Sequence, residues 1–449
     1  MVLDEKVRRG LVPILLWTAS AYIWVLPLFR PRGVYGWGHF RLVDIYVGVP
    51  LLFAALCATV YAIGTERHRL ALRLASIFVS TLITVVLLDL VYAVGFQGLL
   101  RSPGPSDFWF DGTSISRSDN IPDNELGFSR KPGVFWQGRL SPEARYTSYR
   151  TDERGFRNEP GIQQADTVFI GDSFTEGGSV PEEDTFVQQL GKKLNRHVVN
   201  LGCGYYGPQQ ELIVLRRHGL SYNPRVVVWQ LFEGNDLGDA RRFAEWQKNP
   251  IRKESLVQRY TKHSLIARLL ALTMPRGSVI PRKLQHKDGT TGSIYLDYSY
   301  LPDEPARESL GFAETKSALE AGYRLCQSRG IKLVVVFVPI KVRVLEPYVL
   351  FNDQNDKDQY LPGGIKDSEK DFAHETAKFC EHLGCPFIDV TNALRRRASE
   401  DNRFVYMTNQ DSHLDVEGHK VVAEALEKWL QDNLGEGFAS GQPEAAKVK

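Results

Sequence analysis

Three long apolar runs near the start of the chain constrain its fold more than any other feature. Residues 11–29 carry no charged side chain across nineteen positions, and similar apolar runs occupy about 43–64 and 70–97. A helix of such a length covers roughly 30 Å of hydrocarbon. One run of this kind is often the core helix of a soluble protein, but three in succession predict a membrane domain of three transmembrane helices over residues 1–97.

Basic residues beside the runs predict how this domain is oriented. Three flank the N-terminus and three the second loop, against three in the first loop: Lys6, Arg8 and Arg9; Arg67, Arg69 and Arg73; Arg30, Arg32 and Arg41. Because positive residues favour the cytoplasmic side, we expect a multi-pass protein of the inner or plasma membrane with everything after residue 97 outside the cytoplasm. A signal peptide cleaved near Ala19 is the alternative, although it would still leave two runs.

A few residues and the overall charge leave narrower alternatives. Asp89, in the third run, is either a functional intramembrane acid or a side chain that reaches the headgroups. Five cysteines, an odd number, do not indicate a disulfide framework. Cys380 and Cys385 are read as buried thiols, or as a pair in an oxidising compartment. A net charge of +2, without a basic stripe interleaved with aromatic residues, argues against nucleic acid as a partner.

The remainder of the chain divides by composition. Residues 98–150 are rich in Pro, Gly, Ser and Asp and are expected to form a connector. A catalytic domain is expected over 151–435, with an insertion at 237–310 that is too long for a plain connection and could form a lid. Residues 436–449 are typical of a disordered tail.

Short Val- and Ile-rich runs alternate with helical patterns from residue 151 onward. Such runs are typical of strands buried on both faces of a parallel sheet, as in doubly wound α/β folds. Five strands are expected, at 167–171, 197–201, 225–232, 331–339 and 386–390. Helices are expected at 183–195, 207–219, 311–329, 369–383 and 416–433.

Residues able to do chemistry follow these strands, at the edge where an open parallel sheet binds its ligand. The groups are Gly171-Asp172-Ser173, the segment Asn200 to Gly207, Gly234-Asn235-Asp236, and Asp411-Ser412-His413 before the last helix. Each group alone is explained at least as well by a turn or a helix cap. Their order and their positions at successive strand ends favour a common site.

Together these groups supply the parts of an acyl-transfer site. A serine hydroxyl needs a base within hydrogen-bond reach and donors for the oxyanion that forms. Ser173 supplies the hydroxyl, His413 the base, and Asp411 an acceptor for the other ring proton. The expected oxyanion donors are the Ser173 N–H, a main-chain N–H near Gly204 and the Asn235 side chain.

The same groups resemble the four blocks of the SGNH, or GDSL-type, hydrolases. The resemblance covers about 123–432 if the segments DNELGF and YRTDERGFRN are included, and these resemble what precedes the serine in membrane-tethered bacterial members. It implies a flavodoxin-like three-layer α/β/α fold with a parallel five-stranded sheet. It also implies esterase, lipase, carbohydrate deacetylase or O-acyltransferase activity without a metal or organic cofactor.

Carried over by motif, the resemblance makes Ser173 the nucleophile, His413 the base and Asn235 an oxyanion donor. Two positions depart from the pattern. The usual Asp-x-x-His spacing places Gln410 where the acid belongs, so Asp411 serves only by a shorter Asp-x-His spacing, and a Ser-His dyad is the alternative. The donor of the second block aligns nearer Tyr205 than Gly204.

Three functions are compatible with these residues. The first is a membrane-anchored serine esterase or deacylase acting on acyl esters of a surface glycan or lipid. The second is an O-acyltransferase that passes the acyl group to a polysaccharide hydroxyl, with partners in cell-surface polysaccharide assembly. The third is a non-catalytic glycan-binding or assembly protein with the same fold, against which the intact serine, asparagine and histidine argue. No His-x-x-x-His pattern or carboxylate cluster at ligand spacing favours metal-dependent hydrolysis.

Overall fold

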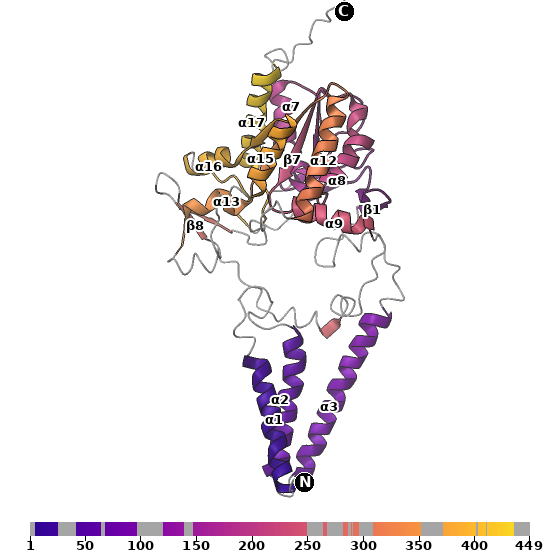
Figure 1. Cartoon of the computed structure of the whole chain (residues 1–449), viewed down its shortest axis with the longest axis vertical. Helices are drawn as coiled ribbons and strands as arrows, with labels where there is room; N and C mark the ends of the chain where they lie inside the picture. Colours follow the sequence, from indigo (N-terminus) through magenta and orange to yellow (C-terminus); the bar gives the residue numbers. More distant parts are fainter. Residues whose placement is uncertain are drawn as a thin grey trace, which may run out of the picture. The chain divides into compact units, whose positions relative to one another are not determined.

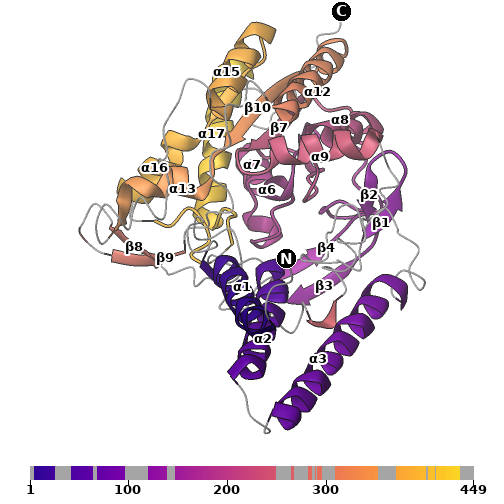
Figure 2. The same cartoon turned by 60° about the horizontal axis from the view of Figure 1, so that its bottom comes forward.

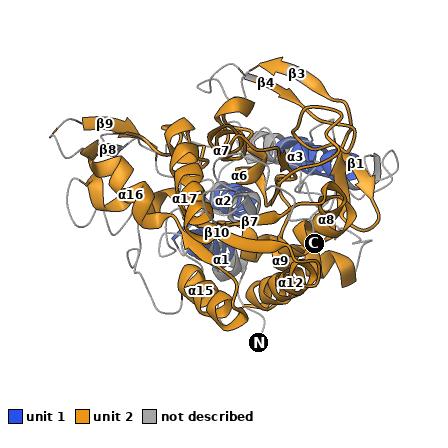
Figure 3. Cartoon of the chain, turned by 90° about the horizontal axis from the view of Figure 1, so that it is seen from above, with its two compact units in different colours: residues 1–103, 253–278 blue, residues 104–252, 279–449 orange. Residues whose placement is uncertain are grey.

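The chain forms two compact units, which Figure 3 shows in different colours. Unit 1 comprises residues 1–103 and 253–278, and unit 2 comprises 104–252 and 279–449. The structure, a computed structural model, describes residues 5–25, 42–63, 68–96, 120–138, 147–248, 264–266, 282–285, 289, 291–295, 309–351, 371–400, 403–409 and 411–434. Gln410 and the expected tail at 436–449 lie outside the described residues.

Unit 1 is built on three helices (Figure 1). Their bounds are α1 Glu5–Val25, α2 Leu42–Ile63 and α3 His68–Leu90, and a π-helical segment, η2 Val91–Phe96, continues α3. The indole N–H of Trp17 donates to the Thr59 hydroxyl at 2.9 Å and so joins α1 to α2. Many large apolar side chains face outward, among them Ile14 and Leu88. An outward apolar surface of this kind is suited to a lipid environment.

The three helices differ in how well they match a membrane span. Among the described residues, only the stretch Ser76–Ala93, 18 residues long, is both long and apolar enough to cross a membrane. The apolar stretches of the other two helices, Leu11–Val25 and Gly48–Thr59, are shorter. The structure therefore supports one candidate span, which by itself is weak evidence for a membrane location.

Asp89 is buried in unit 1 and has polar partners there. Its carboxylate accepts hydrogen bonds from the Ser264 hydroxyl at 2.5 Å and from the N–H groups of Leu265 and Ile266 at 2.7 and 3.4 Å. The side chain thereby satisfies the start of a short helical segment at 265–266. These bonds provide a structural reason for a carboxylate in this apolar helix.

Unit 2 is organised around a parallel five-stranded sheet. Its strands are β5 Thr167–Ile170, β6 Val198–Asn200, β7 Val226–Phe232, β10 Lys332–Val338 and β12 Phe387–Asp389. They lie in the order β12-β10-β7-β5-β6, and every neighbouring pair is parallel. Counted from the opposite edge in chain order, this is the 2-1-3-4-5 order of flavodoxin-like folds. The expected α/β fold with five parallel strands is therefore confirmed, with the strands within a residue or two of their expected bounds.

Helices cover both faces of this sheet and complete three layers (Figure 1). One core contains buried side chains of α7 Phe186–Leu194, α13 Lys341–Leu345, α16 Thr391–Glu400 and α17 Val416–Leu434. The other contains those of α8 Pro208–Arg217, α9 Asp236–Lys248, α12 Leu310–Gln327 and α15 Phe372–Leu383. Short 3-10 turns occur at η3 Glu182–Asp184, η4 Gly219–Tyr222 and η6 Glu346–Tyr348. The strands are buried throughout because apolar residues from both layers cover them.

Two antiparallel hairpins lie in the segment read as a connector. They are β1 Asn120–Asp123 with β2 Gly127–Arg130, and β3 Phe135–Gly138 with β4 Thr147–Arg150. The first hairpin lies beside α8 (Figure 2), where the Gln210 side chain donates to the Leu126 carbonyl at 2.8 Å. Strands of four residues are too short to give a clear alternating pattern, which explains why the sequence did not indicate them.

The expected insertion also contains regular structure. Its first part is α9, which is amphipathic and buries Phe243 and Trp246 in the domain core. Further along, β8 Arg282–Gln285 and β9 Thr291–Ile294 form an antiparallel three-stranded sheet with β11 Val349–Leu350. The Tyr295 N–H donates to the Thr408 carbonyl at 2.9 Å, so this small sheet contacts the segment that precedes Asp411 and His413.

Candidate active site

A tight turn at the end of β5 presents Ser173. The strand ends at Ile170, and Ser173 is the first residue of the one-turn helix α6, Ser173–Glu176. Asp172 caps this helix, because its carboxylate accepts from the Phe174 N–H at 2.9 Å, and Gly177 ends it with a φ of 66°. The interpretation of Asp172 as a helix cap is thus correct. The cap also leaves the N–H of Ser173 without a partner within the helix.

Ser173, His413 and Asp411 form a continuous hydrogen-bonded chain. The Nε2 atom of His413 lies 2.7 Å from the Ser173 hydroxyl oxygen, and its Nδ1 atom lies 2.5 Å from the Asp411 Oδ1 atom. The Asp-x-His spacing allows this geometry because the same Oδ1 atom also accepts from the His413 main-chain N–H at 3.0 Å. The described part of the chain thus contains an Asp-His-Ser arrangement with the distances that a serine nucleophile requires.

The two titratable partners shift each other's pKa in opposite directions. Burial disfavours the charged form of His413, but the Asp411 carboxylate outweighs that effect, so the pKa of His413 is raised. Burial acts against the Asp411 charge as well, and its interactions with His413 and the Ser179 hydroxyl overcome it, so the pKa of Asp411 is lowered. At neutral pH Asp411 is therefore ionised and able to stabilise the imidazolium that forms during proton transfer.

Side chains from other parts of unit 2 hold the Asp411 segment. The Ser179 hydroxyl donates to Asp411 Oδ2 at 2.9 Å. The buried ammonium of Lys341 donates to the main-chain carbonyls of Asn409 and Asp411 at 2.9 and 3.0 Å. The sequence analysis missed both residues. Lys341 follows the fourth strand, at the edge of the sheet where ligand sites lie, and a charged residue there was an available signal.

The expected oxyanion donors do not all point to a substrate. The N–H of Gly204 donates to the Glu176 Oε2 atom at 2.7 Å and is therefore not available to a substrate oxygen in this structure. This corrects the expectation for Gly204, because its N–H already donates a hydrogen bond to a buried carboxylate. The next residue, Tyr205, has a φ of 71°, a left-handed conformation that few non-glycine residues adopt and that is common at functional sites.

Asn235 lies beside the turn that presents Ser173, and both of its amide protons face acidic side chains. Its amide nitrogen donates to Asp239 Oδ2 at 2.8 Å, and an amide nitrogen carries two protons. Burial raises the pKa of Asp172, and hydrogen bonds from the Phe174 N–H and from the Asn235 and Gln230 side chains act against that shift. The side chain of Asn235 is thus placed next to the residue that precedes Ser173.

Among the described residues, no group of three or more His, Cys, Asp or Glu side chains is arranged to hold a metal ion. The buried acids near β7 have other partners. Glu211 accepts from the Trp229 indole at 2.6 Å, and Asp236 accepts from the Phe232 N–H at 2.8 Å. Burial raises the pKa of Asp239 to about 7. These carboxyl groups fix main chain and side chains beneath the site.

The family of this chain follows from a match over much of unit 2. A family model for the GDSL-like lipase/acylhydrolase family matches residues 169–421, more than half of the 449 residues and the region that holds Ser173 and His413. The chain belongs to the GDSL-like lipase/acylhydrolase family. It is accordingly an enzyme that hydrolyses ester bonds. The match begins within β5 and leaves the two hairpins outside.

Solved structures of GDSL-type and other esterases align with 59–60% of the chain. An acetylxylan esterase, Axe2, from Geobacillus stearothermophilus is 13% identical, with 59% of this chain and 93% of that chain covered and a TM-score of 0.32. The esterase EstA from a Pseudoalteromonas species is 10% identical, with 60% and 98% covered and a TM-score of 0.32. A GDSL-like lipase from Bacteroides thetaiotaomicron is 12% identical, with 59% and 87% covered and a TM-score of 0.29.

These structural matches are too distant to support any inference about substrate. No match was found among curated proteins.

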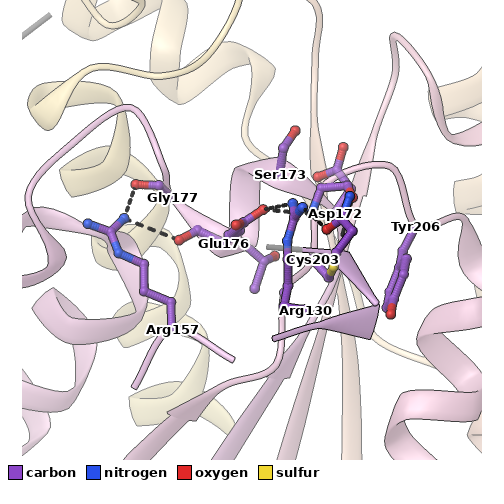
Figure 4. Close-up of polar contacts among 12 residues, drawn as sticks. Arg130, Arg157, Asp172, Ser173, Glu176, Gly177, Cys203 and Tyr206 are labelled. Carbon is purple, nitrogen blue, oxygen red and sulfur yellow. Dashed lines mark hydrogen bonds and ion pairs between the residues drawn. The ribbon is translucent and has the colours of Figure 1, made fainter. Parts of the chain in front are cut away.

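Arg130 of the first hairpin and Arg157 of the loop after the second hairpin contact the turn that presents Ser173 (Figure 4). The Arg157 guanidinium donates to the main-chain carbonyls of Glu176, Gly177 and Val180, with the last at 2.9 Å. Asn158 exchanges hydrogen bonds with the main chain of Asn200, each at 2.8 Å. The signal for both residues was the resemblance of YRTDERGFRN to a segment that precedes the serine, but their contacts could not be read from it.

Proposed function

We propose that this chain is a membrane-anchored serine esterase or deacylase that removes acyl groups from a glycan or lipid outside the cytoplasm. The observation that carries the catalytic part is the pair of contacts from His413, at 2.7 Å to Ser173 and 2.5 Å to Asp411. The membrane part rests on the apolar helices α1, α2 and α3 and on the distribution of basic residues in the sequence.

The proposed reaction proceeds through an acyl-enzyme. As the Ser173 oxygen bonds to the ester carbonyl carbon, His413 Nε2 takes the hydroxyl proton, and Asp411 stabilises the resulting imidazolium. The bond from carbon to the leaving alkoxide then breaks, and His413 gives its proton to that oxygen. A water molecule repeats the sequence on the acyl-enzyme and releases the acid. The Ser173 N–H and the Asn235 side-chain amide are the proposed oxyanion donors.

Labelling with a fluorophosphonate tests the nucleophile directly. The purified full-length protein should react covalently, and Ser173→Ala should not. Peptide mapping should locate the adduct on Ser173. Equal labelling of the two forms, or none of the parent protein, would contradict the assignment.

Product analysis separates hydrolysis from acyl transfer. An acetylated oligosaccharide incubated with the enzyme should release free acetate at the same rate with and without an unacetylated acceptor sugar. Acetylated acceptor that accumulates in place of acetate would support the O-acyltransferase alternative.

A cysteine-accessibility experiment tests the topology. Cysteines introduced at the surface of unit 2 should react with a membrane-impermeant maleimide in intact cells, and protection of these cysteines would overturn the extracytoplasmic placement.

A further inference from the structure

Glu176 places a buried negative charge directly behind the proposed nucleophile. It lies three positions after Ser173 in α6 and is 4% exposed. Its carboxylate accepts from Arg130 Nη2 at 3.0 Å, from the Tyr149 hydroxyl at 2.6 Å and from the Gly204 N–H at 2.7 Å. Figure 4 shows Arg130 reaching Glu176, while the Ser173 side chain points away from both. We refer to Arg130, Tyr149 and Glu176 as the Glu176 cluster.

Two members of the cluster come from the hairpins, outside the family match. Arg130 ends β2 and Tyr149 lies in β4, whereas the match begins at residue 169. Arg130 is 5% exposed, and its other terminal nitrogen donates to the Asn120 side chain at 2.7 Å. Burial disfavours the guanidinium charge, but the neighbouring Glu176 raises the pKa of Arg130. The Arg130 guanidinium is therefore charged, opposite the Glu176 carboxylate.

The pair is not explained by stability alone. A buried ion pair loses as much from desolvation as it gains from attraction, and apolar residues of similar volume often replace it without cost. What it does provide is a fixed geometry, because each charged group must keep its partners. The geometry that this pair fixes is that of the turn containing Gly204.

Gly204 lies between the Glu176 cluster and Ser173. A Cβ atom added at Gly204 would lie 3.0 Å from Glu176 Oε2 and 3.3 Å from both Arg130 Nη2 and the Ser173 Cβ atom. The bond from the Gly204 N–H to Glu176 thus sets the distance between this turn and α6. It also sets the start of the following peptide, which leads into the left-handed Tyr205.

We propose that the Glu176 cluster positions the Gly204–Tyr205 turn against Ser173, so that the two hairpins complete the oxyanion side of the active site. Arg130, Tyr149 and Glu176 are positioning residues that act through the turn and through α6. The inference rests on the proposed role of Ser173 and adds to it that residues 169–421 alone do not make a competent site.

The charge of Glu176 supplies a second, independent readout. Burial lowers the pKa of His413, and the charges of Asp411, Asp172 and Glu176 raise it. Glu176→Gln removes one of these charges and keeps an acceptor for the Gly204 N–H. The acid limb of the pH profile should therefore move to lower pH, which a purely structural role for Glu176 does not predict.

Inactivation kinetics with a fluorophosphonate test the proposal on the full-length protein without knowledge of the substrate. Arg130→Met should lower the maximal inactivation rate by about tenfold to a hundredfold with little change in the reagent's affinity, because small misplacements of reacting groups have effects of this size. Arg130→Lys, which keeps the charge, should recover part of the loss. Arg217→Met is the matched control, since Arg217 binds Asp123 and Glu125 of the same hairpin at the surface and should leave the rate within about twofold.

The double variant Arg130→Met with Glu176→Met guards against simple misfolding. It removes both charges together, so its melting temperature should fall less than that of Arg130→Met, which leaves the Glu176 charge buried and unpaired, while the inactivation rate falls as in Arg130→Met. A parental rate in the double variant, or an unshifted acid limb in Glu176→Gln, would overturn the proposal. Neither result would affect the role of Ser173, which fails separately if Ser173→Ala still reacts.

Discussion

The nucleophile turn, residues 171–177, and the histidine loop, residues 403–409 and 411–415, meet at one hydrogen bond but are held in different ways. Buried side chains from distant segments hold the nucleophile turn, with Arg130 and Arg157 contacting its acceptors. The histidine loop also has main-chain bonds of its own, through the pairing of Tyr406 with Leu414 and a bond from the Met407 N–H to the His413 carbonyl. The Lys341 and Ser179 side chains add bonds to it from elsewhere in unit 2. His413 keeps 28% of its side chain exposed.

This difference suggests a division of labour within the site. Buried charged side chains hold the proposed nucleophile and its oxyanion side, where misplacement costs the most. The proposed base lies on a segment that combines local main-chain bonds with bonds from Lys341 and Ser179, and its side chain is partly exposed. Substitutions on the two sides should therefore act differently. Those on the nucleophile side should affect folding and the placement of the reacting groups, and those on the base side should affect proton transfer.

The largest effect is expected on the base side. His413→Ala removes the group that accepts the Ser173 proton and should lower kcat by about 10⁵-fold or more, with little change in the melting temperature. The measurement is ester hydrolysis by purified full-length protein. His374→Ala, at an exposed position on α15, is the control and should leave kcat unchanged. Substantial residual activity in His413→Ala would place the base elsewhere.

Asp411→Asn is expected to have the next largest effect on kcat, and it tests whether the acid acts at the short Asp-x-His spacing. The amide retains the shape but not the charge, so kcat should fall by about 10³ to 10⁴-fold. Because Asp411 raises the pKa of His413, its loss should lower that pKa. The base must be neutral, so activity is lost as the pH falls through this pKa, and the acid limb should move to lower pH. Asp415→Asn, in the same loop, should change neither quantity, and an unshifted limb in Asp411→Asn would favour a Ser-His dyad.

Arg157→Met probes the nucleophile side and should act on folding. It leaves the carbonyls of Glu176, Gly177 and Val180 without their donor, at a cost of about 2–4 kcal/mol in the free energy of unfolding. Thermal unfolding in detergent measures the change. Arg154→Met is the control, since Arg154 lies in the same loop but bonds the exposed Ser221 hydroxyl. Equal melting temperatures for the two variants would contradict a role for Arg157 in holding the nucleophile turn.

The smallest effect is expected for Ser179→Ala. The hydroxyl donates to Asp411 Oδ2 at 2.9 Å, and a hydrogen bond to a charged group contributes about 1.5–3 kcal/mol. Much of that should be recovered by water at this partly exposed site, leaving a fall in kcat of about tenfold without a change in stability. Ser221→Ala removes a hydroxyl remote from the site and should be silent. A fall as large as that of Asp411→Asn would mean that Ser179 positions the acid more strongly than its single bond suggests.

The sheet and the reacting residues were predictable because their signals are local. A buried parallel strand appears as a continuous apolar run, so Val226–Phe232 and Lys332–Val338 stood out. Residues at strand ends then lie at one edge of the sheet by topology alone. Ser173 was found in this way, whereas Asp411 and His413 were found from their spacing before the last helix and from the family resemblance. The structure brings the three into contact.

The supporting contacts were not predictable because they join residues far apart in the chain. Arg130 meets Glu176 across 46 positions, and Ser179 meets Asp411 across 232. Nothing in the local pattern around Glu176 distinguishes it from an exposed helix residue. For the same reason the Gly204 N–H was expected to donate to a substrate oxygen, whereas it donates to the Glu176 carboxylate of α6.

The double use of Asp411 Oδ1, by the ring and by the main-chain N–H of His413, has a consequence for motion at the site. One atom holds His413 at two points, the ring and the main chain, so Asp411 and His413 keep their mutual geometry as a pair. A displacement of the loop would change the distance from His413 to Ser173 while the acid–base geometry stayed intact. The enzyme could thus be switched off or on by a single distance, without dismantling the group that activates its serine.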